Sequence, residues 1–123
     1  MARDKKSGLK GAVRRFTAPI EDLDREQLAD FCSTLGLTPT IDIELRQRVR
    51  LGGEVRSVRV VPRAGAPALE VTISDGQGTA TAVFLGRSSI AGVTPGRKLT
   101  LEGVVGRDGN RNLVYNPQYT LLP

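Results

Sequence analysis

Apolar and polar residues alternate most regularly between Leu69 and Phe84, on both sides of the segment Asp75-Gly76-Gln77-Gly78. A period of two with many β-branched residues is typical of half-buried strands, and an Asp/Gly-rich connection predicts a hairpin. Pairing Ser74 with Thr79 places large residues opposite small ones on one face, made of Leu69, Val71, Ile73, Ala80, Ala82 and Phe84. Because a slip of one residue would bury threonines instead, the pattern also predicts the register.

A long first strand is predicted from Val49 to Val61. Its apolar residues change parity close after Gly52-Gly53, which indicates a bulge or a sharp coil. Small closed barrels need a bent first strand of this kind, because it pairs in two sheets. The second half of this strand pairs well with the first strand of the hairpin, with Arg59 opposite Glu70, and residues 62–67 form the loop that connects the two strands.

Two further strands are predicted in the last third of the chain. The fourth strand runs from Arg97 to Val105, after a connector at residues 86–92 that includes one possible helical turn. A tight turn with a three-residue tip, Asp108 to Asn110, then leads into the fifth strand. This tip sets Tyr115 inward, opposite Gly103.

The first 48 residues have a different pattern. Residues 1–18 are predicted to be a basic disordered tail, either solubilising or an arm for phosphate contacts, and residues 19–48 a helical extension. A helix is predicted from Ile20 to Gly36, with an apolar stripe of Leu28, Phe31, Cys32 and Leu35. A helix this short is marginal alone, so the stripe should dock on the barrel or on a partner chain. Residues 40–48 fit either a strand or a helical turn.

Composition narrows the classes of function. The net charge of +5 divides into a basic tail, an acidic helical segment and a basic barrel segment, which hints at a polyanionic partner. The chain has no histidine and one cysteine, so the commonest general base and metal ligands are missing. We therefore expect no catalytic site, no metal and no cofactor. No apolar run suggests a membrane span or a secretory signal, so the expected location is cytoplasmic.

Residues 49–122 resemble the OB-fold nucleic-acid-binding family, in particular its anticodon-binding-like and RecG-helicase-wedge-like group. The resemblance rests on three motifs, V-R-L-G-G-E-V, V-T-I-S-D-G-Q-G-T-A-T-A-V-F-L-G and I-A-G-V-T-P-G-R-K-L-T-L-E-G-V-V. The whole chain is similar to small actinobacterial OB-fold proteins. The resemblance implies a mainly β fold, with a five-stranded Greek-key barrel over residues 49–123, and nucleic-acid binding without catalysis.

The family binds polynucleotides across strands two and three, between the loops that follow strands one and four. The candidate binding residues are the basic and amide side chains of these loops, one first-strand arginine and three face threonines: Arg63, Arg107, Asn110, Arg111, Asn112, Arg56, Thr72, Thr79 and Thr81. The predicted turn opposes Arg107 and Arg111, which favours an anion between them unless both splay into water.

Aromatic residues bear on the strength of binding. Phe84 and Tyr115 are predicted to point inward, and Tyr119 alone is expected to be exposed, away from the main face. Binding of single-stranded DNA or RNA would then rest on charge, and it would be weak and salt-dependent. The alternative hypothesis is an OB-type adaptor domain that binds a protein partner, in which the helix face contributes Leu28, Phe31 and Leu35.

Overall fold

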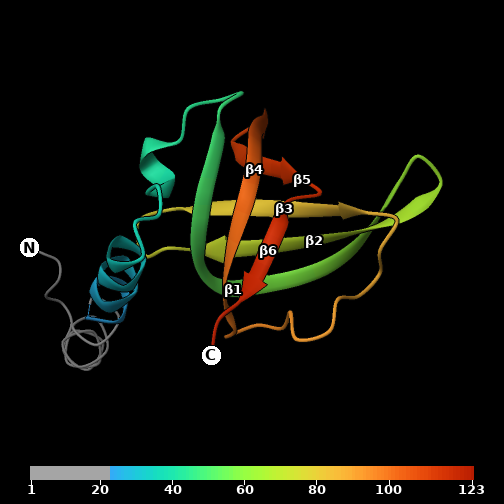
Figure 1. Ribbon diagram of the computed structural model, residues 1–123. Coiled ribbons are helices and arrows are strands. Elements are labelled where there is room, and N and C mark those ends of the chain that lie inside the picture. Colours follow the sequence, from blue (N-terminus) through green and yellow to red (C-terminus); the bar gives the residue numbers. More distant parts are fainter. Residues whose placement is uncertain (1–22) are drawn as a thin grey trace, which may run out of the picture.

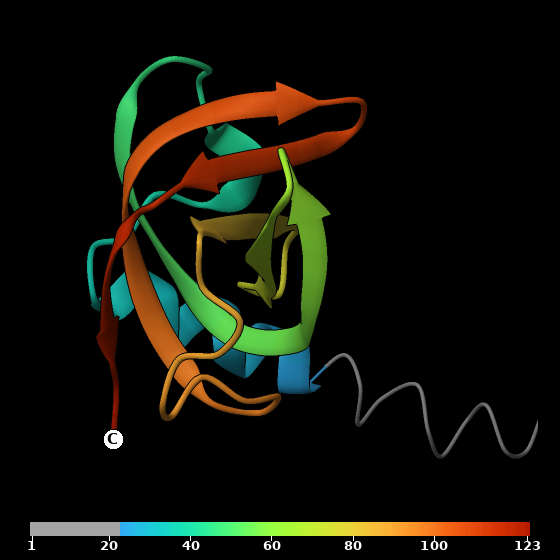
Figure 2. The same cartoon turned by 90° about the vertical axis from the view of Figure 1, so that its right-hand side faces the viewer.

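The computed structural model describes residues 23–123 (Figure 1). The predicted basic tail and the first residues of the predicted helix lie outside the described residues. Six strands follow a helix: β1 (Arg48–Arg63), β2 (Ala66–Ser74), β3 (Thr79–Leu85), β4 (Lys98–Asp108), β5 (Arg111–Tyr115) and β6 (Gln118–Leu121). They form one sheet in the order β1-β2-β3-β5-β4-β6, and a further pairing of β1 with β4 closes the barrel (Figure 2).

The strand order and the β1–β4 closure are those of the OB-fold, which confirms the predicted fold class. β3 and β5 run parallel, and all other neighbours are antiparallel. The prediction of five strands missed β6, which pairs with the first half of β4, for example Leu99 with Leu121. The missed strand lies in the segment after Asn116, where the chain turns back along β4.

β1 is long enough to serve two neighbours. Its first half pairs with β4, and its second half pairs with β2, where Arg59 lies opposite Glu70 as predicted. The register shifts between Val55 and Ser57, so Arg56 is the extra residue of the predicted bulge. The predicted loop of residues 62–67 is in fact a two-residue turn, Ala64-Gly65, because pairing continues to Arg63 opposite Ala66.

The core lies inside the barrel. The β2–β3 hairpin has the predicted register, with Ser74 opposite Thr79 and Leu69 opposite Phe84. The inward residues of this hairpin pack with Leu51, Leu99, Leu101 and Val105 of the facing strands. Residues 86–97 contain no helix, so the predicted helical turn is wrong there. Ile90 and Val93 from this connector are buried in the same core.

The β4–β5 hairpin corrects the sequence prediction. Its turn has two residues, Gly109-Asn110, with Asp108 opposite Arg111 and Val105 opposite Val114. This register differs by one residue from the three-residue tip, and a one-residue slip exchanges the faces of a strand. Val114 therefore enters the core, while Tyr115 points outward and is 47% exposed.

The helix of residues 23–34 docks on the barrel of its own chain. Leu28, Cys32 and Leu37 form a small buried cluster, and the Cys32 Sγ–H donates to the Gly52 carbonyl at 3.6 Å. Burial, with a smaller contribution from the Asp75 charge, raises the pKa of the Cys32 thiol to about 11. Leu28 is therefore not available to a partner, which corrects the helix face proposed from the sequence.

Asp75 fastens this helical segment to the β2–β3 turn. Its carboxylate accepts hydrogen bonds from the Gln77 and Gly78 amides at 3.0 Å, which is the turn role expected of it. It also accepts from the amide and hydroxyl of Thr40, at 2.7 and 2.8 Å. Thr40 begins the short 3-10 helix η1 (Thr40–Asp42), so the ambiguous segment of residues 40–48 starts with a helical turn and reaches strand only at Arg48.

Candidate nucleic-acid interface

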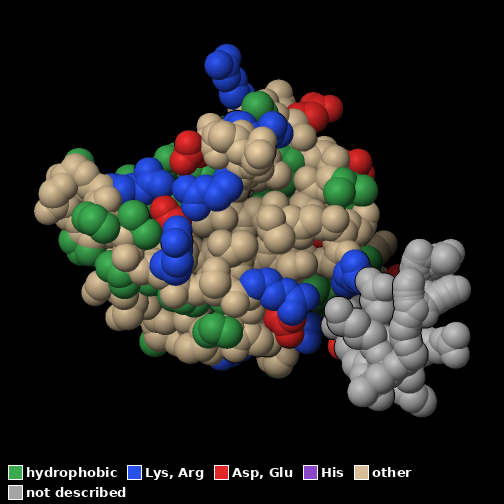
Figure 3. Space-filling view, turned by 180° about the vertical axis from the view of Figure 1, so that it is seen from behind, with side chains coloured by type: hydrophobic (Ala, Val, Ile, Leu, Met, Phe, Trp, Pro, Cys, Tyr) green, Lys and Arg blue, Asp and Glu red, His purple; other side chains and the backbone are tan. Residues whose placement is uncertain are grey.

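One face of the sheet formed by β1, β2, β3 and β5 points away from the core, and we call it the outer sheet face. Strand alternation places on it Arg59, Arg63, Glu70, Thr72, Thr79, Thr81, Val83, Leu85, Arg111, Leu113 and Tyr115. Seen from behind Figure 1, Lys and Arg side chains gather around an acidic side chain on the molecular surface (Figure 3). In an OB-fold this is the face between the β1–β2 and β4–β5 hairpins.

An arginine cluster, made of Arg59, Arg63 and Arg111, surrounds Glu70 on this face. Arg59 Nη2 and Arg111 Nη1 donate to Glu70 Oε1 at 3.2 and 3.0 Å. Arg63 Nη2 donates to Glu70 Oε2 at 3.0 Å. The three arginines come from β1 and β5, and the carboxylate at their centre comes from β2. The β1–β2 hairpin and the distant strand β5 thus meet at one buried charge.

The Glu70 side chain is only 3% exposed, whereas those of its three partners are 29–64% exposed. Burial by itself would raise the pKa of the Glu70 carboxyl. Hydrogen bonds from Arg63, Arg111 and Arg59 outweigh burial and lower that pKa from 4.5 to about 2. The carboxylate is therefore charged at neutral pH, and the outward guanidinium groups keep donors that do not point at Glu70.

Tyr115 presents an aromatic ring beside the arginine cluster. The guanidinium carbon of Arg63 lies 5.7 Å from the ring centroid, and Arg63 Nη1 donates to Tyr115 Oη at 3.3 Å. Leu85, 46% exposed, lies on the same face at the end of β3. Asn116 fixes this end of the sheet, because its Oδ1 accepts from the Leu85 amide at 2.9 Å. The result is a partly exposed ring held next to positive charge.

The structure brings together two of the predicted loop residues, Arg63 and Arg111, but through Glu70. Arg107 does not oppose Arg111, so the predicted anion between that pair is wrong. Arg107 instead lies opposite Asn112 and donates from Nε to its Oδ1 at 3.2 Å, on the other face of the hairpin. Asn110 is exposed in the turn.

The remaining predicted residues are spread over several environments. Thr72 and Thr81 lie on the outer sheet face and share a 3.1 Å hydrogen bond, but Thr81 is buried and cannot reach a ligand. Thr79 is exposed at the start of β3. Arg56 lies away from this face, at the β1 bulge, where it pairs with Glu54 at 2.8 Å. The structure therefore does not bring Arg56 together with the arginine cluster.

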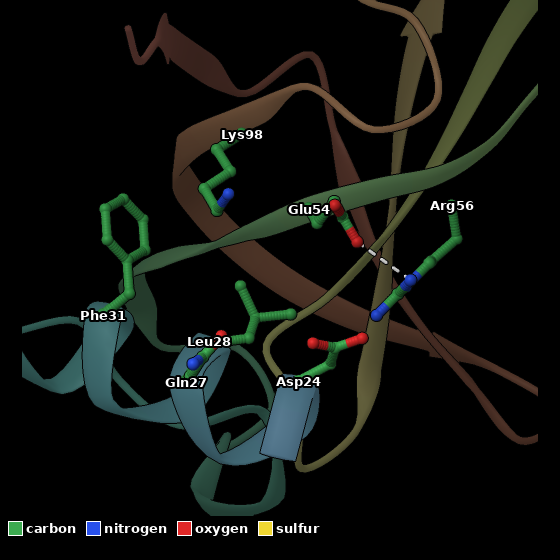
Figure 4. Close-up of a pocket in the computed structure, with 7 residues that line it drawn as sticks. All are labelled: Asp24, Gln27, Leu28, Phe31, Glu54, Arg56 and Lys98. Carbon is green, nitrogen blue, oxygen red and sulfur yellow. Dashed lines mark ion pairs between the residues drawn. The ribbon is translucent and has the colours of Figure 1, made fainter. Parts of the chain in front are cut away.

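Arg56 and Glu54 line a different hollow, a pocket of about 440 Å³ between the helix and the barrel (Figure 4). The other lining residues come from the helix and from the start of β4: Asp24, Gln27, Leu28, Phe31 and Lys98. The Lys98 ammonium lies 5.7 Å from the Phe31 ring centroid. Because acidic and basic side chains are balanced around it, this pocket has no charge preference for a polyanion.

Sequence reasoning missed Tyr115 and the central position of Glu70. The predicted three-residue tip is one residue longer than the observed turn, and this points Tyr115 inward; a two-residue turn at Gly109-Asn110 is the signal that would have found it. The sequence pattern pairs Glu70 with Arg59 alone. Its contact with Arg111 depends on the parallel pairing of β3 with β5, which no local pattern indicates.

The described part of the chain contains neither a metal-ligating cluster nor a membrane-spanning helix. Within residues 23–123, no three His, Cys, Asp or Glu side chains come together as a metal site. Over the same residues, no helix is long and apolar enough to cross a membrane.

Comparisons with known proteins give a distant structural likeness and no sequence match. No protein-family model and no curated protein sequence matches the chain. Among solved structures, the chain is similar to one from a replication protein A heterotrimer bound to ssDNA, at 12% identity and a TM-score of 0.48. The match covers 72% of this chain and 74% of that one. The OB-fold assignment rests on strand order and barrel closure, and the finer family group stays a prediction.

Proposed function

We propose that this protein is a non-catalytic module that binds single-stranded nucleic acid on its outer sheet face. The observation that carries the proposal is the exposed Tyr115 ring, held beside the arginine cluster. Base stacking on an aromatic side chain contributes roughly 1–3 kcal/mol per base and tolerates any sequence. The outward guanidinium donors can contact the phosphates that follow the stacked base.

The charges on this face set the expected strength of binding. The three arginines carry +3, and Glu70 and Asp108, which pairs with Arg111 at 3.2 Å, return two negative charges. A local excess of one positive charge supports few phosphate contacts, so stacking should supply much of the affinity. Duplexes keep their bases stacked internally and should bind more weakly than single strands.

Fluorescence anisotropy with labelled single-stranded DNA, single-stranded RNA and duplex tests the proposal at low salt. Tyr115→Ala should weaken single-strand binding by roughly 5- to 150-fold, which corresponds to one lost stacking contact. Tyr119→Ala is the matched control, because Tyr119 is 39% exposed but lies on β6, away from the outer sheet face. Equal losses in both variants, or no binding by the unmodified protein, would refute the proposal and direct the search to protein partners.

A further inference from the structure

Glu70 is an acidic residue at the centre of a face that we propose binds a polyanion, which is an unusual position for a negative charge. It lies at the centre of the outer sheet face, 3% exposed, with three guanidinium groups within 3.0–3.2 Å of its oxygens. Arg63 and Arg111 approach from different strands and meet only at this carboxylate. Without a negative charge there, the three cations would repel one another at short range.

The Glu70 carboxylate does not satisfy every hydrogen-bond donor of the arginine cluster. The Nε–H of Arg63 is buried and has no acceptor among the described residues. A carboxylate offers two oxygens, and both are already engaged by the cluster. A phosphate group offers more oxygens and more charge, so it could satisfy guanidinium donors from several sides.

We propose that Glu70 is an internal counterion that occupies the anion position of the arginine cluster. It holds the three guanidinium groups in place and keeps a phosphate from binding between them, so the cluster contacts a nucleic acid only through its outward donors. A neutral residue at position 70 converts the cluster into a phosphate-binding site. The part of this inference that concerns nucleic acid rests on the proposed function, whereas the anion site itself does not.

The first test uses pyrophosphate as the probe, at low millimolar concentration and constant ionic strength, with thermal unfolding as the readout. Pyrophosphate should raise the Tm of Glu70→Gln by at least about 4 °C and leave that of the unmodified protein unchanged. Glu102→Gln is the charge-matched control. The Glu102 carboxylate pairs with Arg48 at 3.2 Å in an exposed position outside the cluster. The Tm of Glu102→Gln should therefore not respond to pyrophosphate.

Three outcomes of this test would contradict the inference. One is an equal pyrophosphate response in Glu70→Gln and Glu102→Gln. Another is a response of the unmodified protein as large as that of Glu70→Gln, because Glu70 would then not exclude the anion. If Glu70→Gln is unfolded without anion, pyrophosphate should restore folding, and a variant that stays unfolded at every concentration would count against the proposal.

The second test measures the salt dependence of single-strand binding. For one additional neutralised phosphate, the slope of log K against log salt should steepen by about 0.7 in Glu70→Gln, a relative gain of about fivefold per tenfold fall in salt. A purely structural role for Glu70 would lower affinity without steepening the slope. Failure of the unmodified protein to bind single strands would refute the proposed function, and the pyrophosphate test would still decide the anion site.

Discussion

Acid unfolding is the most direct test of how strongly the arginine cluster stabilises the charged form of Glu70. The pKa of this carboxyl is lowered in the folded protein from 4.5 to about 2 by hydrogen bonds that outweigh its burial. A lowered pKa means that the folded state binds its proton less tightly than the unfolded chain does. Its contribution to stability is therefore complete above pH 4.5 and is lost as the pH falls toward 2.

The size of this contribution follows from the shift. A difference of one pKa unit corresponds to about 1.4 kcal/mol, so a change from 4.5 to about 2 contributes about 3 kcal/mol at neutral pH. By linkage, about 2 kcal/mol of this should already be lost at pH 3. The side chain is 3% exposed, so solvent screening weakens its ion pairs less than it weakens surface pairs.

Urea unfolding between pH 7 and pH 3 measures this loss when the protein is compared with Glu70→Gln. Removing one partner of a buried ion pair should destabilise the variant by about 3–5 kcal/mol at pH 7, and the gap should narrow by about 2 kcal/mol at pH 3. Glu102→Gln should show a small gap that hardly changes, because its pair with Arg48 is exposed. A gap for Glu70→Gln that stays constant over this pH range would refute the reasoning.

Three further predictions concern the attachment of the helix to the barrel. Asp75→Ala should lower the free energy of unfolding by about 3 kcal/mol, because four hydrogen bonds to the turn and to Thr40 of η1 are lost. In the same urea titration, Asp42→Ala should change the free energy of unfolding by less than about 0.5 kcal/mol, because the Asp42 side chain is exposed. Gly76→Ala should destabilise the protein more than Gly65→Ala does. Both glycines have a positive φ, but only a Cβ at position 76 would meet a helix carbonyl, that of Arg25. Equal urea midpoints for the two variants would contradict this prediction. Cys32 should react with a thiol reagent at pH 8 only after denaturant is added, and rapid labelling of the folded protein would show that the helix undocks.

Most of the barrel could be predicted because its signals are local. In the β2–β3 hairpin, large and small residues alternate across a short turn, so one register satisfies every pair at once, as with Leu69 and Phe84. The parity change in β1 likewise required an extra residue, and the bulge is found at Arg56. Both features depend on residues within one strand or one hairpin.

The candidate site was harder to predict because it depends on two features that the local pattern leaves open. One is the length of the β4–β5 turn, where Gly109 adopts a φ of 61° and allows a two-residue connection. The other is the parallel contact of β3 with β5, which brings Arg111 to Glu70. The sequence predicts Arg63 as a binding residue from its place next to the β1–β2 turn, but it does not predict that Arg63 and Arg111 share Glu70.

The register of the β4–β5 hairpin also protects the site. Val114 is 1% exposed in the core, and its neighbour Tyr115 points to the outer sheet face. A slip of one residue would expose Val114 and bury the tyrosine hydroxyl away from Arg63, and it would separate Arg111 from Glu70. The register that buries Val114 therefore also places Tyr115 and Arg111 on the outer sheet face, so a variant that keeps this register should keep both residues on that face.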